Sequence, residues 1–265
     1  MNTPDGAIAG IYSVSAMEKV YFSQGNLQYQ ASTNTWRFAE KQYYTIGENN
    51  SNISSSYSGW IDLFGWGTSG WNCGNTYYRP WDSNNSDGSL YGPPGQYNLT
   101  GSYANSDWGV HNAISNGGNR VGLWRTLTKS EWAFLLTTRY TSSGIRFAKA
   151  QVNGVNGVIL VPDDWNVTTF SLNNTNETGA SFTSNVVGEM VWQNTFEPAG
   201  AVFLPAAGFR YGASVVSVGG GGLYWSASCD NSYSAYDVYF YGGLGTDHWN
   251  VRFYGLSVRL VCPAE

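Results

Sequence analysis

The chain has 265 residues, of which 12% are charged and 16% are aromatic, with 33 glycines and a net charge of −5. Disordered chains combine few aromatic residues with high net charge, and coiled coils need abundant Ala, Glu, Lys and Leu, so this composition excludes both classes. A nucleic-acid partner would need a basic stripe, which this acidic and sparsely charged chain does not offer. What remains is a globular protein of short strands joined by many turns.

The N-terminal segment is typical of β-structure. Residues 20–22 are a β-branched and aromatic run, and residues 27–31 alternate apolar with polar side chains. Residues 33–34 favour a turn, after which residues 36–38 continue the alternation on a returning strand. We therefore expect a strand followed by a β-hairpin.

Residues 47–122 are dominated by Gly, Ser, Asn, Trp and Tyr and have only weak periodicity. So long a segment without a regular pattern is unusual inside a compact domain. Its many tryptophans predict ordered loops that are held in place by buried rings. A short helix is expected within it, at 106–114.

The clearest helix is predicted to run from Thr128 to Arg139. Thr128 and Glu131 form a T-x-x-E capping box at its start. Its apolar face, at positions i, i+3 and i+4, consists of Trp132, Leu135 and Leu136.

The rest of the chain is predicted to be rich in strands. They are expected at 144–148, 157–161, 201–204 and 258–261, and residues 236–241 alternate again. No linker and no repeat of fixed period interrupts the sequence. We therefore expect residues 1–265 to form a single α+β domain of mostly short antiparallel strands, with one or two helices and long ordered loops.

Few residues suggest catalysis. The only histidines, His111 and His248, lie outside any HExxH motif or Cys/His cluster, and Asp247–His248 is expected to be a polar surface pair. No G-x-S-x-G motif is present. The pair Asp163–Asp164 and Asp230 could serve glycoside hydrolysis, although any chain offers such carboxylates. We expect a non-enzymatic protein without a cofactor or a metal; a carbohydrate-active or oxidative enzyme is the alternative.

The three cysteines, Cys73, Cys229 and Cys262, are far apart and are expected to be isolated thiols. The first ten residues lack the basic and apolar regions of a signal peptide. The apolar stretches at 157–161 and 199–209 are too short to cross a bilayer. We expect no membrane insertion, and a monomer in isolation.

Three segments of the chain carry a family resemblance. They read GLWRTLTKSEW at 122–132, FLPAAGFR at 203–210 and, between 222 and 261, GLYWS followed by YGLSVRLV. The first is similar to the R-L-P-T-E-A-E-W helix start of formylglycine-generating enzymes, which have a C-type lectin fold. The order of the other two resembles the variable region of diversity-generating retroelement variable proteins. Those are bacterial and phage ligand-binding proteins whose C-type lectin fold displays a hypervariable surface.

The resemblance implies a C-type lectin fold for the whole chain, with residues 1–205 as the scaffold and 206–262 as the variable ligand-binding region. It also implies a receptor or adhesin that acts outside the cell, on a bacterial surface or a phage virion. Its ligand would be a protein or a glycan on a cell surface.

Two departures from related families narrow the expected function. Formylglycine-generating enzymes use a pair of cysteines in their C-terminal part, and Cys229 and Cys262 match no such motif, so oxidase activity is not expected. Calcium-dependent lectins read sugars with E-P-N followed by W-N-D. Glu197-Pro198-Ala199 lacks the Asn and no W-N-D follows, so calcium-dependent sugar binding is not expected either.

The composition of 206–262 agrees with the retroelement resemblance. In that family, adenines are mutagenised, chiefly in Asn AAY codons, and such codons cannot become Lys, Glu, Gln, Met or Trp. Residues 1–205 contain 21 Lys, Glu, Gln and Met, whereas the 57 residues 206–262 contain none. Trp249 lies outside this codon set and would need a different template codon.

The alternation of strand side chains separates the expected core from the expected site. The inward positions are expected to be Trp225, Tyr236, Val238, Phe240, Val258 and Leu260. Outward and loop positions combine aromatic and small polar residues, as antibody paratopes do. This expected ligand-binding site consists of Phe209, Tyr211, Leu223, Tyr233, Asp237, Tyr239, Tyr241, Asp247, His248, Trp249, Val251, Phe253, Tyr254 and Leu256.

Overall fold

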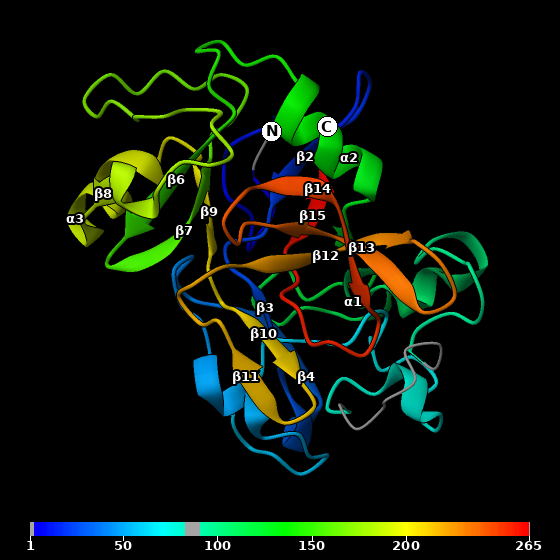
Figure 1. Cartoon of the computed structure of the whole chain (residues 1–265). Helices are drawn as coiled ribbons and strands as arrows, with labels where there is room; N and C mark the ends of the chain where they lie inside the picture. Colours follow the sequence, from blue (N-terminus) through cyan, green and yellow to red (C-terminus); the bar gives the residue numbers. More distant parts are fainter. Residues whose placement is uncertain (1–2, 83–90, 265) are drawn as a thin grey trace.

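The computed structural model of the protein describes residues 3–82 and 91–264 (Figure 1). Their architecture is α+β, with mostly short antiparallel strands and few helices, as the sequence indicated. The described strands form two four-stranded sheets, one three-stranded sheet and two hairpins.

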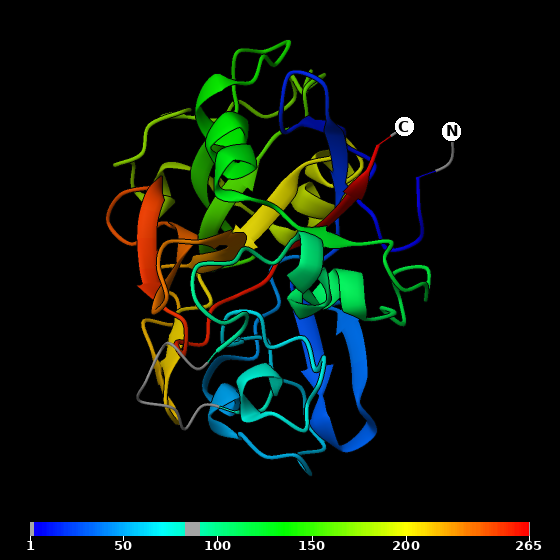
Figure 2. The same cartoon turned by 90° about the vertical axis from the view of Figure 1, so that its right-hand side faces the viewer.

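The first four-stranded sheet joins the two ends of the described chain. Its order is β1-β2-β15-β5, made by β1 (Tyr12–Ser13), β2 (Lys19–Phe22), β15 (Leu260–Pro263) and β5 (Arg125–Thr126). β15 pairs antiparallel with both β2 and β5. The segments that carry β2 and β15 therefore lie side by side in both views (Figures 1 and 2). The strands expected at 20–22 and 258–261 are confirmed, although the second begins only at Leu260.

The second four-stranded sheet has the order β8-β6-β7-β9. Its strands are β8 (Val186–Val187), β6 (Phe147–Val152), β7 (Val155–Leu160) and β9 (Val202–Pro205). All neighbours are antiparallel except the short pair β6 and β8. β6 begins later and runs further than the strand expected at 144–148. The reason is a two-residue hairpin turn at Asn153 and Gly154, both with positive φ.

The three-stranded sheet β12-β13-β14 consists of β12 (Leu223–Cys229), β13 (Ser234–Tyr239) and β14 (Gly245–Val251). The two separate hairpins are β3 (Leu27–Gln30) with β4 (Thr35–Phe38), and β10 (Phe209–Tyr211) with β11 (Ser214–Val216). The first of them confirms the hairpin expected from the sequence, with Asn34 in the left-handed conformation at its turn.

The helices are short. They are α1 (Trp108–His111), α2 (Lys129–Ala133), α3 (Glu189–Val191), the π-helical turns η6 (Phe134–Thr138) and η8 (Trp192–Phe196), and the 3₁₀ turns η1 (Ala31–Thr33), η2 (Gly47–Ser51), η3 (Thr76–Tyr78), η5 (Gly101–Ser106) and η7 (Phe182–Ser184). The predicted helix at 128–139 corresponds to α2 continued by η6, and its capping box is present. Asp107 caps α1 and confirms a short helix inside 106–114. No described helix is long and apolar enough to span a bilayer.

Two hydrophobic clusters lie on either side of β12 and β13. The first includes Phe22, Trp132, Leu135, Tyr224, Val238 and Phe240. The second includes Trp36, Trp66, Trp108, Leu223, Trp225, Leu256 and Val258. Trp66 and Trp108 come from the Trp-rich segment, and their burial confirms that buried rings hold the described part of its loops. Residues 83–90 of that segment lie outside the described residues.

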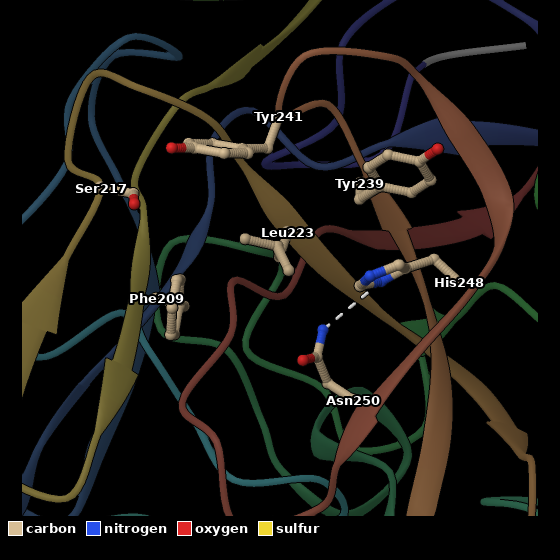
Figure 3. Close-up of a pocket in the computed structure, with 7 residues that line it drawn as sticks. All are labelled: Phe209, Ser217, Leu223, Tyr239, Tyr241, His248 and Asn250. Carbon is tan, nitrogen blue, oxygen red and sulfur yellow. Dashed lines mark hydrogen bonds between the residues drawn. The ribbon is translucent and has the colours of Figure 1, made fainter.

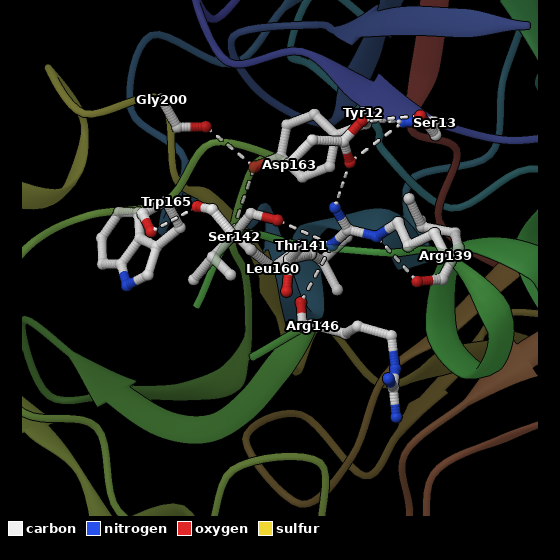
Figure 4. A network of polar contacts seen from close by, with 12 residues as sticks. Tyr12, Ser13, Arg139, Thr141, Ser142, Arg146, Leu160, Asp163, Trp165 and Gly200 are labelled. Atoms are coloured by element: carbon white, nitrogen blue, oxygen red, sulfur yellow. Dashed lines mark hydrogen bonds and ion pairs between the residues drawn. The ribbon is translucent and has the colours of Figure 1, made fainter. Parts of the chain in front are cut away.

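A buried ion pair connects the end of η6 to the segment that follows β7, and through it to β1 (Figure 4). Arg139 is fully buried, and its guanidinium lies 2.9 Å from a carboxylate oxygen of Asp163. Asp163 also accepts hydrogen bonds from the backbone and hydroxyl of Ser13. Asp163 therefore has a structural role, whereas its neighbour Asp164 is exposed. This arrangement does not favour the pair as two catalytic carboxylates.

Candidate ligand-binding site

The sheet β12-β13-β14 carries different side chains on its two faces. One face, here the pocket face, carries Leu223, Trp225, Asp237, Tyr239, His248 and Asn250. The other, here the helix face, carries Tyr224, Tyr236, Val238, Asp247, Trp249 and Val251. Lys129 of α2 lies over the helix face, with its ammonium 2.7 Å from Asp247 and 3.6 Å from the centre of the Tyr236 ring.

An open pocket of about 290 Å³ lies on the pocket face (Figure 3). It is lined by Phe209, Ser217, Leu223, Tyr239, Tyr241, His248 and Asn250. All seven belong to the segment 206–262, and five of them are among the predicted site residues. Three rings and one leucine make most of the wall, so the pocket is mainly apolar, with a few polar groups at its edge.

A hydrogen-bonded trio lies at one side of this pocket. Nδ1 of His248 is 2.9 Å from one carboxylate oxygen of Asp237, and the amide of Asn250 donates to the other at 2.8 Å. The Asp237 side chain is fully buried, whereas 39% of the His248 side chain is exposed. The Tyr239 ring packs against the imidazole, with 4.6 Å between ring centres. Asp237 and Tyr239 thus fix the orientation of His248.

Both ionisable groups of the trio have shifted pKa values. The hydrogen bond to Asp237 raises the pKa of His248 above its usual value of 6.5 and outweighs the opposing effect of burial. Burial raises the pKa of Asp237, although His248 and Asn250 partly oppose this shift. The imidazole on the wall of the pocket therefore keeps its proton to a higher pH than an ordinary histidine does.

Four aromatic rings form a cluster beside the pocket. They belong to Phe209, Tyr211, Phe253 and Tyr254, and their neighbouring ring centres are 5.3 to 5.7 Å apart. Phe209 is stacked on Tyr254 and also lines the pocket. The pocket and the ring cluster are therefore contiguous and form one candidate surface.

The expected exposure holds for most predicted site residues. Tyr211, Tyr233, Tyr241, Asp247 and Trp249 are exposed, and Phe209, Tyr239, His248, Val251, Phe253 and Tyr254 are partly exposed. The expectation is wrong for Leu223, Asp237 and Leu256, which are buried. Asp247, Trp249 and Val251 lie on the helix face, away from the pocket.

Leu223 and Asp237 are buried because β12 and β13 are covered on both faces. Leu223 forms the floor of the pocket, and Asp237 lies beneath His248. The backbone of Leu256 exchanges two hydrogen bonds with Phe64, which holds the leucine inside the second cluster. The expected surface pair Asp247–His248 is also wrong, since the two side chains point to opposite faces.

The expected inward positions are confirmed at five of six residues. Trp225, Val238, Phe240, Val258 and Leu260 are buried. Tyr236 is the exception, because its ring lies on the helix face beneath the Lys129 ammonium and remains partly exposed.

The sequence analysis missed two residues of the pocket. Asn250 follows His248 by two residues on β14, so the same alternation that faces His248 inward could have identified it. Ser217 lies beyond the end of β11 at positive φ and carries no comparable signal in the sequence.

Three buried arginines hold the segment that builds the site, and the sequence analysis missed them too. They are Arg210, Arg252 and Arg259. Arg252 donates to the backbone carbonyls of Pro93, Gly95 and Asn231, at 2.8, 2.8 and 2.6 Å. Its guanidinium also lies 4.5 Å from the centre of the Trp66 ring. Arg210 and Arg252 donate to main-chain oxygens. Arg259 donates to the side-chain amide oxygens of Asn26 and Gln42 and to the backbone carbonyl of Phe203. Burial lowers the pKa of each of the three arginines to about 10.

The described residues contain no group of three or more His, Cys, Asp or Glu that could hold a metal ion. The three cysteines are free thiols, as expected. Ser217 lies across the pocket from His248 (Figure 3), and the two side chains share no hydrogen bond.

No protein-family model matches the chain, and no curated protein and no solved structure matches it either.

Proposed function

We propose that this chain is a non-enzymatic ligand-binding protein, of receptor or adhesin type, that displays a diversified aromatic site on a C-type lectin fold. The site is the pocket together with the adjoining ring cluster. It would act outside the cell, on a bacterial surface or a phage virion, with a cell-surface protein or glycan as ligand.

The observation that carries this proposal is that all residues of the pocket and of the ring cluster belong to one segment of the chain. The pocket and the ring cluster are built entirely from 206–262, the segment without Lys, Glu, Gln or Met. Every residue that lines them belongs to the set that a mutagenised AAY codon can encode. The aromatic and small polar character of these residues suits an adaptable binding surface.

Within 206–262, buried residues that maintain the fold alternate with outward residues that build the site, and this supports the same proposal. Outward rings can change without loss of the core only if other residues of the segment keep the fold. Trp225, Arg252 and Arg259 are buried and hydrogen-bonded. Trp225 and Arg252 lie between the candidate site positions in the sequence, and Arg259 follows the last of them. The mixed architecture of short antiparallel strands agrees with the fold that the resemblance implies.

The genome around the gene tests this proposal. We expect a reverse-transcriptase gene nearby and a near-identical template copy of the 3′ end, with adenines at the positions that differ. The differences should fall in codons of pocket and ring-cluster residues such as Tyr239, Tyr241 and Phe253. Codons of Trp225, Arg252 and Arg259 should be the same in both copies and serve as the internal control. A neighbourhood without a template copy, or differences concentrated at the buried residues, would contradict the proposal.

A further inference from the structure

The imidazole of His248 offers one free ring nitrogen to the pocket. Nδ1 is occupied by Asp237, with Asn250 also close at 3.5 Å. Among the described residues Nε2 has no hydrogen-bond partner. Because the ring lines the pocket and is partly exposed, Nε2 is the nitrogen available to a ligand.

The carboxylate of Asp237 determines what Nε2 can do. An ionised carboxylate only accepts hydrogen bonds, so Nδ1 keeps its proton in both states of the ring. In the neutral ring Nε2 is then an acceptor, and in the protonated ring it is a donor. Around His248 the other pocket groups are the neutral side chains of Tyr239, Tyr241 and Asn250, while the charged pair of Lys129 and Asp247 lies on the helix face.

The rest of the pocket selects a single flat apolar group. Its volume of about 290 Å³ is at the lower edge of the roughly 300–1,000 Å³ range of small-molecule pockets. Phe209, Tyr239 and Tyr241 offer ring surfaces, against which another ring packs well. A hydroxyl is the polar group that can bond to Nε2 in either protonation state, because it both donates and accepts.

We propose that this pocket binds the phenol ring of a tyrosine side chain on a protein partner, with the phenol oxygen hydrogen-bonded to Nε2 of His248. The inference rests on the proposed ligand-binding function and narrows it to one ligand class. A pyranose ring fits less well, since its several hydroxyls would face apolar walls and few polar groups. A carboxylate fits less well, since it could bond to Nε2 only while the ring is protonated.

Four small probes test this assignment in the intact chain: p-cresol, toluene, benzoate and methyl β-glucopyranoside. Binding is followed by NMR of the two imidazoles, because His111 and His248 are the only histidines. We expect p-cresol to shift the His248 signals in a saturable way and to leave His111 unchanged. It should bind roughly two- to tenfold more tightly than toluene, the value of one net hydrogen bond. That preference should persist on both sides of the His248 titration.

Two variants with matched controls locate the hydrogen bond. His248→Phe should reduce the preference for p-cresol over toluene to about one, whereas His111→Phe should keep it. Should His248→Phe fail to fold, Asp237→Asn tests the same idea through the tautomer. It should populate the Nε2–H form in the ¹⁵N spectrum at high pH. p-Cresol should then shift this Nε2–H signal and keep its preference over toluene, because the phenol oxygen can accept as well as donate, whereas Asp247→Asn should leave the neutral ring in the Nδ1–H form. A p-cresol preference that is lost in Asp237→Asn, or an unshifted Nε2–H signal, would contradict the bond.

Three outcomes would overturn the inference. Benzoate that binds more tightly than p-cresol would indicate an anion site, and tighter binding of the glucoside would indicate a glycan site. Equal affinity for p-cresol and toluene would show that His248 makes no bond to the phenol. None of these results depends on the template copy in the genome. The proposal of a diversified site and the proposal of a tyrosine ligand can therefore be contradicted independently.

Discussion

At the scale of single residues, the two histidines have opposite environments. His248 bonds to a buried carboxylate, which raises its pKa, whereas burial lowers the pKa of His111 at the end of α1. Asp237 and His248 are 11 residues apart, and they meet only because β13 and β14 pair in that register. Spacing along the chain could not predict this contact.

An NMR pH titration should separate the two histidines. We expect His248 to titrate above 6.5 and His111 below it, with assignments from His111→Phe. Since the folded-state pKa of His248 is raised, its stabilising contribution is complete below about 6.5 and is lost as the pH rises through the higher folded value. Asp237→Asn should bring the two pKa values closer together. Two histidines that titrate together near 6.5 would show that the Asp237 contact does not form.

Adjacent residues on β13 and just after it should differ sharply in their contribution to stability. Phe240 is fully buried against Tyr224, so Phe240→Ala should cost about 3–5 kcal/mol of unfolding free energy. Tyr239 is only partly buried on the pocket wall, so Tyr239→Ala should cost no more than about 1 kcal/mol. Urea unfolding of both variants measures the difference. A larger loss for Tyr239→Ala would place its ring in the core.

At the scale of elements, local signals predicted local structure well. The β3–β4 hairpin and the start of α2 follow from patterns within a few residues, namely alternation with a turn and a capping box. The alternation assigned the side chains of β13 to the right faces but did not predict their burial, because a strand covered on both sides carries buried residues at odd and even positions alike. The pocket itself combines side chains of four strands, β10, β12, β13 and β14, and of two loops, and no local pattern brings them together.

The capping box of α2 provides a test at this scale. Thr128→Ala removes the bond from the Glu131 backbone to the Thr128 hydroxyl and should cost about 1 kcal/mol. Ser130→Ala, at an exposed position of the same helix, is the control and should cost nothing measurable. Chemical denaturation of the two variants gives the comparison. Equal stability of both would mean that the bonds of the Glu131 carboxylate to Arg125 and to the backbone of residue 128 are sufficient without the Thr128 hydroxyl.

At the scale of the whole molecule, the stability of the site region depends on a few hydrogen bonds between residues that are far apart in the sequence. Arg252 joins β14 to the loop at 93–95 and to the turn before β13, so three segments distant in sequence share one guanidinium. Composition and periodicity could not predict this, since arginine is usually an exposed residue.

Removal of this anchor should weaken the whole fold. Arg252→Met leaves several buried carbonyl oxygens without a donor, and we expect a loss of about 3 kcal/mol or more in unfolding free energy. Arg120→Met, at an exposed position, should stay within about 0.5 kcal/mol of the parent protein. Thermal and urea unfolding of both variants measure this. A loss for Arg252→Met no greater than that for Arg120→Met would show that the anchor is dispensable.

The contacts of the buried arginines also determine which substitutions the segment that builds the site can tolerate. Every residue has a backbone carbonyl oxygen, whichever codon encodes it. The hydrogen bond from Arg252 to the carbonyl of residue 231 therefore does not depend on the side chain at that position. Carboxylate partners would instead have to be copied faithfully together with each arginine. If error-prone copying leaves the three arginine codons unchanged, it could therefore substitute the codons around them and still yield chains that fold.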